Sequence, residues 1–247
     1  MKTKLLGAFA ALALSVASPA LADIIHVTYA GTVSAGTDTT GVFGPPSTLL
    51  DGDAFALTYT FDTAKGIFTS GFNSSLAGGP GFGPGIYSSP GTAVLTINGH
   101  SADFIVDPNP PSQGYSEFLV EGPRSDGTFF IQQQVNNVVN NLATTNHYIE
   151  KIVVTDTFLA IPLSLTTAYV LSAAPGVEFQ SSFRIFEGGN CGNNFCPSQD
   201  AFGVLSPTSV TVSVSAVPLP ATLPLFASGL LGLGLLGWRR KKTAAAG

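Results

Sequence analysis

Near its middle the chain reads Thr92-Ala-Val-Leu-Thr-Ile-Asn-Gly-His-Ser-Ala-Asp-Phe-Ile-Val106. Asn98-Gly99 separates two runs in which apolar and polar residues alternate, and this dipeptide suits the two positive-φ positions of a type I′ turn. With a two-residue loop, the predicted cross-strand pairs are Ile97 with His100, Leu95 with Ala102 and Ala93 with Phe104. Because these pairs gather apolar side chains on one face, the stretch predicts an antiparallel β-hairpin that covers a core.

The same period of two continues on both sides of the hairpin. Phe55–Phe61 places a large side chain at every second position, and Val210–Val214 alternates valine with threonine and serine. Both patterns are typical of half-buried strands. Gly78–Gly91 and Asn136–Asn146 are rich in turn residues and are predicted as loops. Further strands are predicted at Ile25–Val33, Ile67–Phe72, Ser116–Glu121, Thr128–Val135, Ile149–Val154, Leu163–Leu171, Val177–Glu187 and Val204–Ser206.

Short strands, frequent turns and the lack of a 3.6-residue apolar stripe predict an all-β fold. The expected architecture is a single antiparallel β-sandwich or jelly-roll-like domain over residues 23–216. A region of this length can bury one sizeable core but is short for two.

The N-terminus has the three parts of a secretory signal peptide. Lys2 and Lys4 form a charged start, Leu5–Val16 is an apolar core, and Ser18–Ala22 ends in a small-x-small cleavage site. Residues 1–22 are therefore predicted to be removed before Asp23.

The C-terminus combines a short motif, an apolar span and a basic end. Val217, Pro218, Leu219, Pro220 and Ala221 form the motif. A transmembrane helix is predicted at about 223–238, although the two early prolines shorten its firmly helical part. A buried core helix is the alternative, but a run of four cations directly after the span disfavours it. This basic stop consists of Arg239, Arg240, Lys241 and Lys242, and residues 243–247 are predicted to be disordered.

These two ends together resemble the PEP-CTERM family of exported bacterial proteins, in the variant named for the sequence Val-Pro-Leu-Pro-Ala that stands at 217–221. The commonest form of the family has Glu where Leu219 stands. The resemblance implies recognition by an exosortase, a membrane-embedded transpeptidase-like protease, and cleavage near the motif. It also implies a bacterium that makes exopolysaccharide or a biofilm matrix. It covers the ends alone and assigns no activity to residues 23–216.

Charge is unevenly distributed along the chain. Residues 23–216 hold all fifteen carboxylates and four cations, which gives this region a net charge of −11. Such a domain should repel nucleic acid, since it has no basic patch to neutralise phosphates. An acidic surface is common in exported proteins, and binding of a divalent cation is the functional alternative. The weak candidates for a Ca²⁺ site are Asp51, Asp53 and Asp107, which turn-capping aspartates would equally explain.

The two cysteines of the chain are Cys191 and Cys196. In an oxidising compartment this spacing favours a local disulfide, while free thiols or a metal or redox pair are the alternatives. No cofactor is predicted.

The expected function is that of an exported cell-surface or matrix protein with a noncatalytic interaction domain. It would be anchored in the membrane at least transiently, with the domain periplasmic or extracellular and the tail cytoplasmic. Its partners would be the exosortase and an exopolysaccharide. The alternatives are a carbohydrate- or calcium-binding module and a glycoside hydrolase, whose carboxylate pair would come from Glu117, Glu121, Glu150, Glu178 and Glu187.

Overall fold

The computed structural model describes residues 23–69, 74–81, 88–108, 114–121, 127–141, 147–160, 163, 167–191, 194–195 and 199–216. Within these residues the chain is all-β, its paired strands are antiparallel, and no helix occurs. The strands are β1 (Asp23–Asp38), β2 (Thr48–Leu49), β3 (Ala54–Asp62), β4 (Ile67–Thr69), β5 (Ser74–Gly78), β6 (Gly91–Ile97), β7 (His100–Ile105), β8 (Tyr115–Glu121), β9 (Phe129–Asn141), β10 (His147–Leu159), β11 (Tyr169–Ser172), β12 (Val177–Cys191), β13 (Asn194–Phe195) and β14 (Gln199–Ala216).

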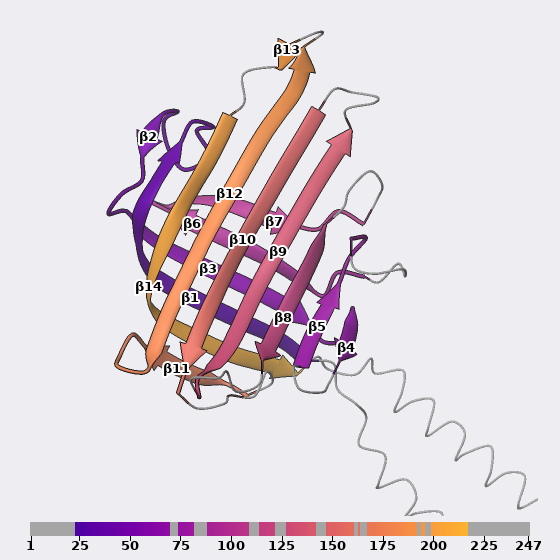
Figure 1. The fold of residues 1–247 in the computed structure, drawn as a ribbon, viewed down its shortest axis with the longest axis vertical. Coiled ribbons are helices and arrows are strands. Elements are labelled where there is room, and N and C mark those ends of the chain that lie inside the picture. The colour runs from indigo at the N-terminus through magenta and orange to yellow at the C-terminus, as the bar shows by residue number, and fades with distance from the viewer. Residues whose placement is uncertain are drawn as a thin grey trace, which may run out of the picture. The chain divides into compact units, whose positions relative to one another are not determined.

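These strands form one sheet that curls on itself like half of a barrel. Their order is β4-β5-β8-β9-β10-β12-β14-β1-β3-β6-β7, and β2, β11 and β13 pair beside this path. Figure 1 shows β8, β9, β10 and β12 as a front layer that crosses steeply over a rear layer of β1, β3, β6 and β7. The all-β antiparallel prediction is confirmed, and the two layers belong to one continuous sheet.

The hairpin predicted at Asn98-Gly99 is confirmed in its register. Ile97 lies opposite His100, and the next inward pairs are Leu95 with Ala102 and Ala93 with Phe104. Asn98 and Gly99 have φ values of 52° and 81°, as a type I′ turn requires.

Several predictions about strands were wrong in detail; the predicted strand Leu163–Leu171, for example, is strand among its described residues only from Tyr169, where β11 begins. β9 continues through Asn141, so the first half of the predicted asparagine-rich loop is strand. β14 runs unbroken from Gln199 to Ala216 through Pro207, and so joins two predicted strands. β5 had not been predicted; its small side chains, Ser74 to Gly78, give little alternation, yet β8 pairs with all of it.

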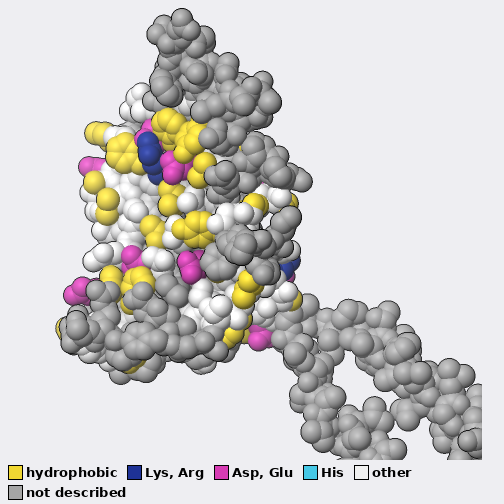
Figure 2. All heavy atoms as spheres, turned by 45° about the vertical axis from the view of Figure 1, so that its right-hand side comes forward, with side chains coloured by type: hydrophobic (Ala, Val, Ile, Leu, Met, Phe, Trp, Pro, Cys, Tyr) yellow, Lys and Arg dark blue, Asp and Glu magenta, His cyan; other side chains and the backbone are white. Residues whose placement is uncertain are grey.

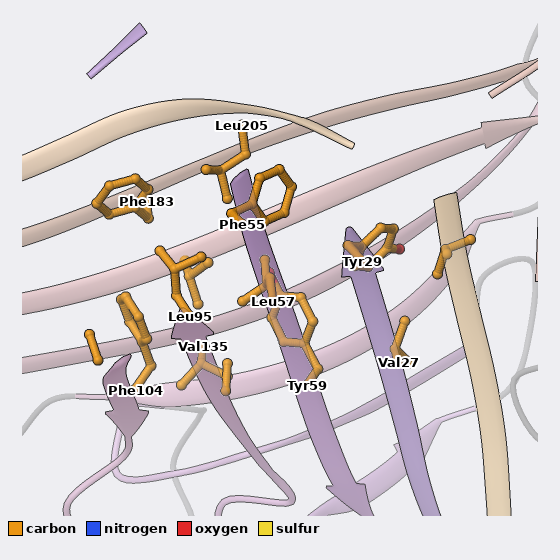
Figure 3. Packing of buried hydrophobic residues seen from close by; sticks show 14 of the residues in the cluster. Val27, Tyr29, Phe55, Leu57, Tyr59, Leu95, Phe104, Val135, Phe183 and Leu205 are labelled. Atoms are coloured by element: carbon orange, nitrogen blue, oxygen red, sulfur yellow. The ribbon is translucent and has the colours of Figure 1, made fainter. Parts of the chain in front are cut away.

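The core lies between the two layers. Val27, Tyr29, Leu57, Tyr59 and Phe104 point from the rear layer towards side chains of the front layer (Figure 3). Ring contacts join the layers directly, since Phe61 of β3 stacks on Phe118 of β8 with centroids 5.1 Å apart. These side chains are fully or almost fully buried, so the alternating pattern of the sequence marks the inner face of each strand.

Two buried tyrosines carry hydrogen bonds across this core. The Tyr29 hydroxyl donates to Gln133 Oε1 at 2.5 Å and lies 2.8 Å from Thr157 Oγ1. The Tyr59 hydroxyl lies 3.0 Å from Thr155 Oγ1. Because a buried polar group without a partner is costly, these pairs help to fix how the layers are aligned.

The buried tyrosines predict that the fold weakens at alkaline pH. Burial raises the pKa of Tyr29 and of Tyr59 well above the usual value, and raises that of Tyr169 to about 12. In the unfolded chain these phenols ionise near pH 10. Between about pH 10 and 12 the unfolded chain therefore binds fewer protons than the folded one, so the free energy of unfolding falls as pH rises.

Urea titrations followed by circular dichroism are the measurement. The urea midpoint should show no tyrosine-dependent change below about pH 9, where the phenols are protonated in both states, and should drop from about pH 10 upward. Phenolate absorbance should rise in step with unfolding. Ionisation of all six tyrosines near pH 10 in a chain that stays folded would contradict this prediction.

Candidate functional site

The candidate site is a groove on the outward face of the front layer, along β10 and β12. Alternation places every second side chain of these strands on this face, among them Asp156, Phe158, Glu178 and Gln180. Two hollows that share Gln180 make up the groove. Figure 2 shows acidic side chains scattered among hydrophobic ones on the side of the molecule that it presents.

The first hollow, of about 500 Å³, lies where β10 ends at Leu159 and β12 begins at Val177. Phe158 forms part of its wall and packs on Phe130 of β9, with centroids 5.5 Å apart. The Ala160 amide donates to the Gly176 carbonyl at 3.1 Å, and Gly176 has a φ of 83° that favours glycine. The lining residues are Thr128, Phe158, Leu159, Ala160, Gly176, Glu178 and Gln180.

The second hollow, of about 400 Å³, lies where two strands part. β14 pairs with β12 from Gln199 to Leu205, and the last of these pairs is Ser181 with Leu205. Beyond it β14 pairs with β11 instead, so among the described residues Glu178–Gln180 of β12 pairs with β10 alone. The lining residues are Val154, Asp156, Phe179, Gln180, Ser181, Ser182, Val204, Leu205 and Ser206.

The polar side chains of the groove come in a cross-strand row. Asp156 lies opposite Gln132 of β9 and opposite Gln180 of β12. Gln132 Nε2 donates to Asp156 Oδ1 at 2.8 Å, which holds the carboxylate in place. Glu178 and Gln180 are exposed. The row therefore offers amide and carboxylate groups to solvent beside the Phe158 ring.

Arg184, the basic residue nearest on β12, is engaged elsewhere on the same face. Its guanidinium forms ion pairs with Asp200 at 3.1 Å and Glu150 at 3.6 Å, and lies over the Phe186 ring at 4.9 Å. The hydrogen bonds to Asp200, with the nearby carboxylates, raise its pKa further. The two carboxylates that Arg184 pairs with lie outside the groove lining.

The carboxylates proposed as calcium ligands do not gather at one place. Asp51 and Asp53 precede β3, and Asp107 follows β7. In the registers of β3, β6 and β7, this puts Asp53 and Asp107 at opposite ends of the rear layer, about 30 Å apart at 3.3 Å per residue. Asp51 Oδ1 accepts from the Gly36 amide at 2.8 Å, as a turn-capping aspartate does. Among the residues that the structure describes, no group of three metal-ligating side chains occurs.

Asp38 is a fully buried carboxylate that sequence reasoning missed. Its Oδ1 accepts from the Thr40 amide, the Thr40 hydroxyl and the Gly41 amide, at 2.9, 2.6 and 2.9 Å. Its Oδ2 accepts from the Phe43 amide at 2.7 Å. These four bonds order the loop after β1, so the role of Asp38 is structural. The Asp-Thr-Thr-Gly sequence at 38–41 signals such a loop but not its burial.

The glutamates considered for glycoside hydrolysis are spread over the front layer. Glu117 on β8 accepts from Ser75 Oγ at 3.0 Å, and Glu150 on β10 pairs with Arg184. Glu187 is exposed near the far end of β12, and Glu178 is the one that lines the groove. Glu121 ends β8.

The remaining predicted sites fall at the edge of the described residues or outside them. Cys191 ends β12 and lies opposite Asn194 of β13, while Cys196 is outside the described residues, in which no disulfide is found. The disulfide therefore stays a prediction. The signal peptide, the motif at 217–221, the span at 223–238 and the basic stop at 239–242 also lie outside. A search of the described part of the chain for a helix long and apolar enough to cross a membrane finds none.

Comparisons of the chain with protein-family models, with curated proteins and with solved structures find no match.

Proposed function

We propose that this protein is an exported cell-surface or matrix protein, delivered by its C-terminal sorting tail, whose folded domain is a noncatalytic interaction module. The observation that carries the proposal is the order of features in the sequence: a leader at 1–22, then the motif at 217–221, the apolar span and the basic stop at 239–242. An exosortase-type protease would be its processing partner, and an exopolysaccharide matrix its surroundings. The domain would belong to the sandwich or jelly-roll-like architectures.

The bounds of the folded domain support this proposal. β1 begins at Asp23, directly after the predicted cleavage site, and β14 ends at Ala216, directly before the motif. The chain separates into a compact unit of Ala22–Ser215 and the two ends. Cleavage at either end would therefore leave every described strand whole, which suits a domain that is processed after export.

Deletion of residues 217–242 is expected to abolish association with the cell envelope and to release the domain into the medium. The reason is that the deletion removes the motif, the apolar span and the basic stop but leaves β14 complete. Immunoblots of cell, membrane and medium fractions from the producing bacterium measure the outcome.

Deletion of residues 243–247 is the matched control, because it shortens the same end without touching the sorting features. It should distribute as the full chain does. Equal envelope association of both deletion variants would overturn the sorting role.

A further inference from the structure

We propose that the groove along β10 and β12 binds a neutral glycan. The inference goes beyond the proposed sorting role and does not depend on it, since it rests on the groove residues alone. It begins from the size of the two hollows, about 500 and 400 Å³, which lie within the roughly 300–1,000 Å³ of ligand pockets. Because Gln180 lines both, the two hollows are neighbours, and together they offer room for more than one sugar unit.

The chemistry of the lining favours sugars. A sugar presents adjacent hydroxyls, each of which both donates and accepts, and an apolar face of C–H groups. Asp156, held by Gln132, accepts such bonds, and the exposed Gln180 amide both donates and accepts. Two residues further along the same face, Phe158 lies opposite Glu178. Its ring can pack against the apolar face of a sugar.

The charge of the groove decides which glycan it suits. The two carboxylates are Asp156 and Glu178, and none of the described residues that line either hollow is a lysine or arginine. An anionic polysaccharide would therefore meet like charge from these two carboxylates. A neutral glycan meets no charge repulsion, and its hydroxyls can donate hydrogen bonds to the carboxylates.

Calcium fits the groove less well than a glycan does. Ca²⁺ takes six to eight oxygen ligands, usually several of them carboxylates. Asp156 and Glu178 are diagonal neighbours on adjacent strands, and no third carboxylate is among the lining residues described.

Calorimetric titration of the full chain tests the proposal. The protein is held in a detergent without a sugar headgroup, since a glycoside detergent would compete for the groove. The probes are cello-, malto- and mannooligosaccharides, with alginate as the anionic polymer and calcium chloride as the cation. At least one neutral oligosaccharide should bind, and Gln180→Ala should weaken that binding about tenfold, because Gln180 lines both hollows.

Gln199→Ala is the matched control. Gln199 is also an exposed strand glutamine, at the start of β14, and lines neither hollow. This variant should bind as the unaltered chain does. Glu178→Ala is a second groove variant at an exposed position, and it should also weaken binding. It keeps the test decisive in case Gln180→Ala disturbs the fold.

Three results would overturn the proposal. They are the absence of binding by every neutral oligosaccharide, equal binding by the groove variants and the Gln199→Ala control, and binding of alginate or calcium alone. None of them bears on the sorting tail, whose failure the localisation experiment detects separately.

Discussion

Replacing Phe61 by alanine is expected to lower the free energy of unfolding by about 3–5 kcal/mol. The Phe61 side chain is fully buried. Its ring stacks on Tyr59 of the same strand at 6.1 Å and on Phe118 of the opposite layer at 5.1 Å. Alanine would remove the ring that joins the two layers and leave a cavity that the sheets cannot easily fill.

Phe68→Ala is the matched control, because Phe68 on β4 is 59% exposed. The same change of side chain should there alter the unfolding free energy by less than about 0.5 kcal/mol. Urea unfolding of the full chain in detergent, followed by circular dichroism, measures both variants. Equal losses at the two positions would mean that Phe61 does not lie in the core.

Gly31→Ala is expected to lower the free energy of unfolding by about 3 kcal/mol or more, because the new methyl group would clash with backbone atoms. A Cβ atom at Gly31 would lie 2.1 Å from the Ser206 carbonyl oxygen and 2.8 Å from Pro207 Cα. Both neighbours are backbone atoms, so no side-chain movement relieves the contact. Either β1 or β14 must shift, at the place where the sheet passes from one layer to the other.

Gly52→Ala is the matched control, because it removes the conformational freedom of glycine without causing a steric clash. Gly52 has a φ of 84°, and a Cβ atom there would meet nothing within 4 Å. Its substitution should therefore lower the free energy of unfolding by about 1–2 kcal/mol, because alanine disfavours the left-handed backbone conformation. A thermal or urea midpoint for Gly31→Ala no lower than that for Gly52→Ala would contradict the close approach of β1 and β14.

Local patterns predicted the strands best where a turn and an alternation agree. The β6–β7 hairpin was predicted to the residue, because Asn98-Gly99 fixes the loop length and Leu95 and Phe104 fix the buried face. β5 was missed because Ser74–Gly78 is a strand through its pairing with β8, which local sequence does not encode. Pro207 does not end β14; it lies between the segment of β14 that pairs with β12 and the segment that pairs with β11.

The groove could not be predicted from the sequence. Gln180 lies in a predicted strand, but Asp156 and Phe158 lie beyond the predicted strand Ile149–Val154. Their meeting depends on the longer β10 and on its register with β12. The second hollow depends on β14 leaving β12 after Leu205, which is a property of the curled sheet. Asp51, Asp53 and Asp107 are predicted as calcium ligands because they are loop carboxylates, and the sheet places Asp107 far from the other two.

The first and last strands of the domain are neighbours, and this has a consequence for the order of folding. Thr39 on the loop after β1 bonds to Asp200 across 161 positions, and Thr208 bonds to the Ala30 carbonyl across 178. Contacts between such distant residues raise the contact order and slow folding, because a long chain must close before it gains any contact energy. A ribosome delivers β14 last, so the sheet stays open between β12 and β1 until synthesis has almost finished. The growing polypeptide therefore stays incompletely folded, and able to pass through a narrow channel, for most of its translation.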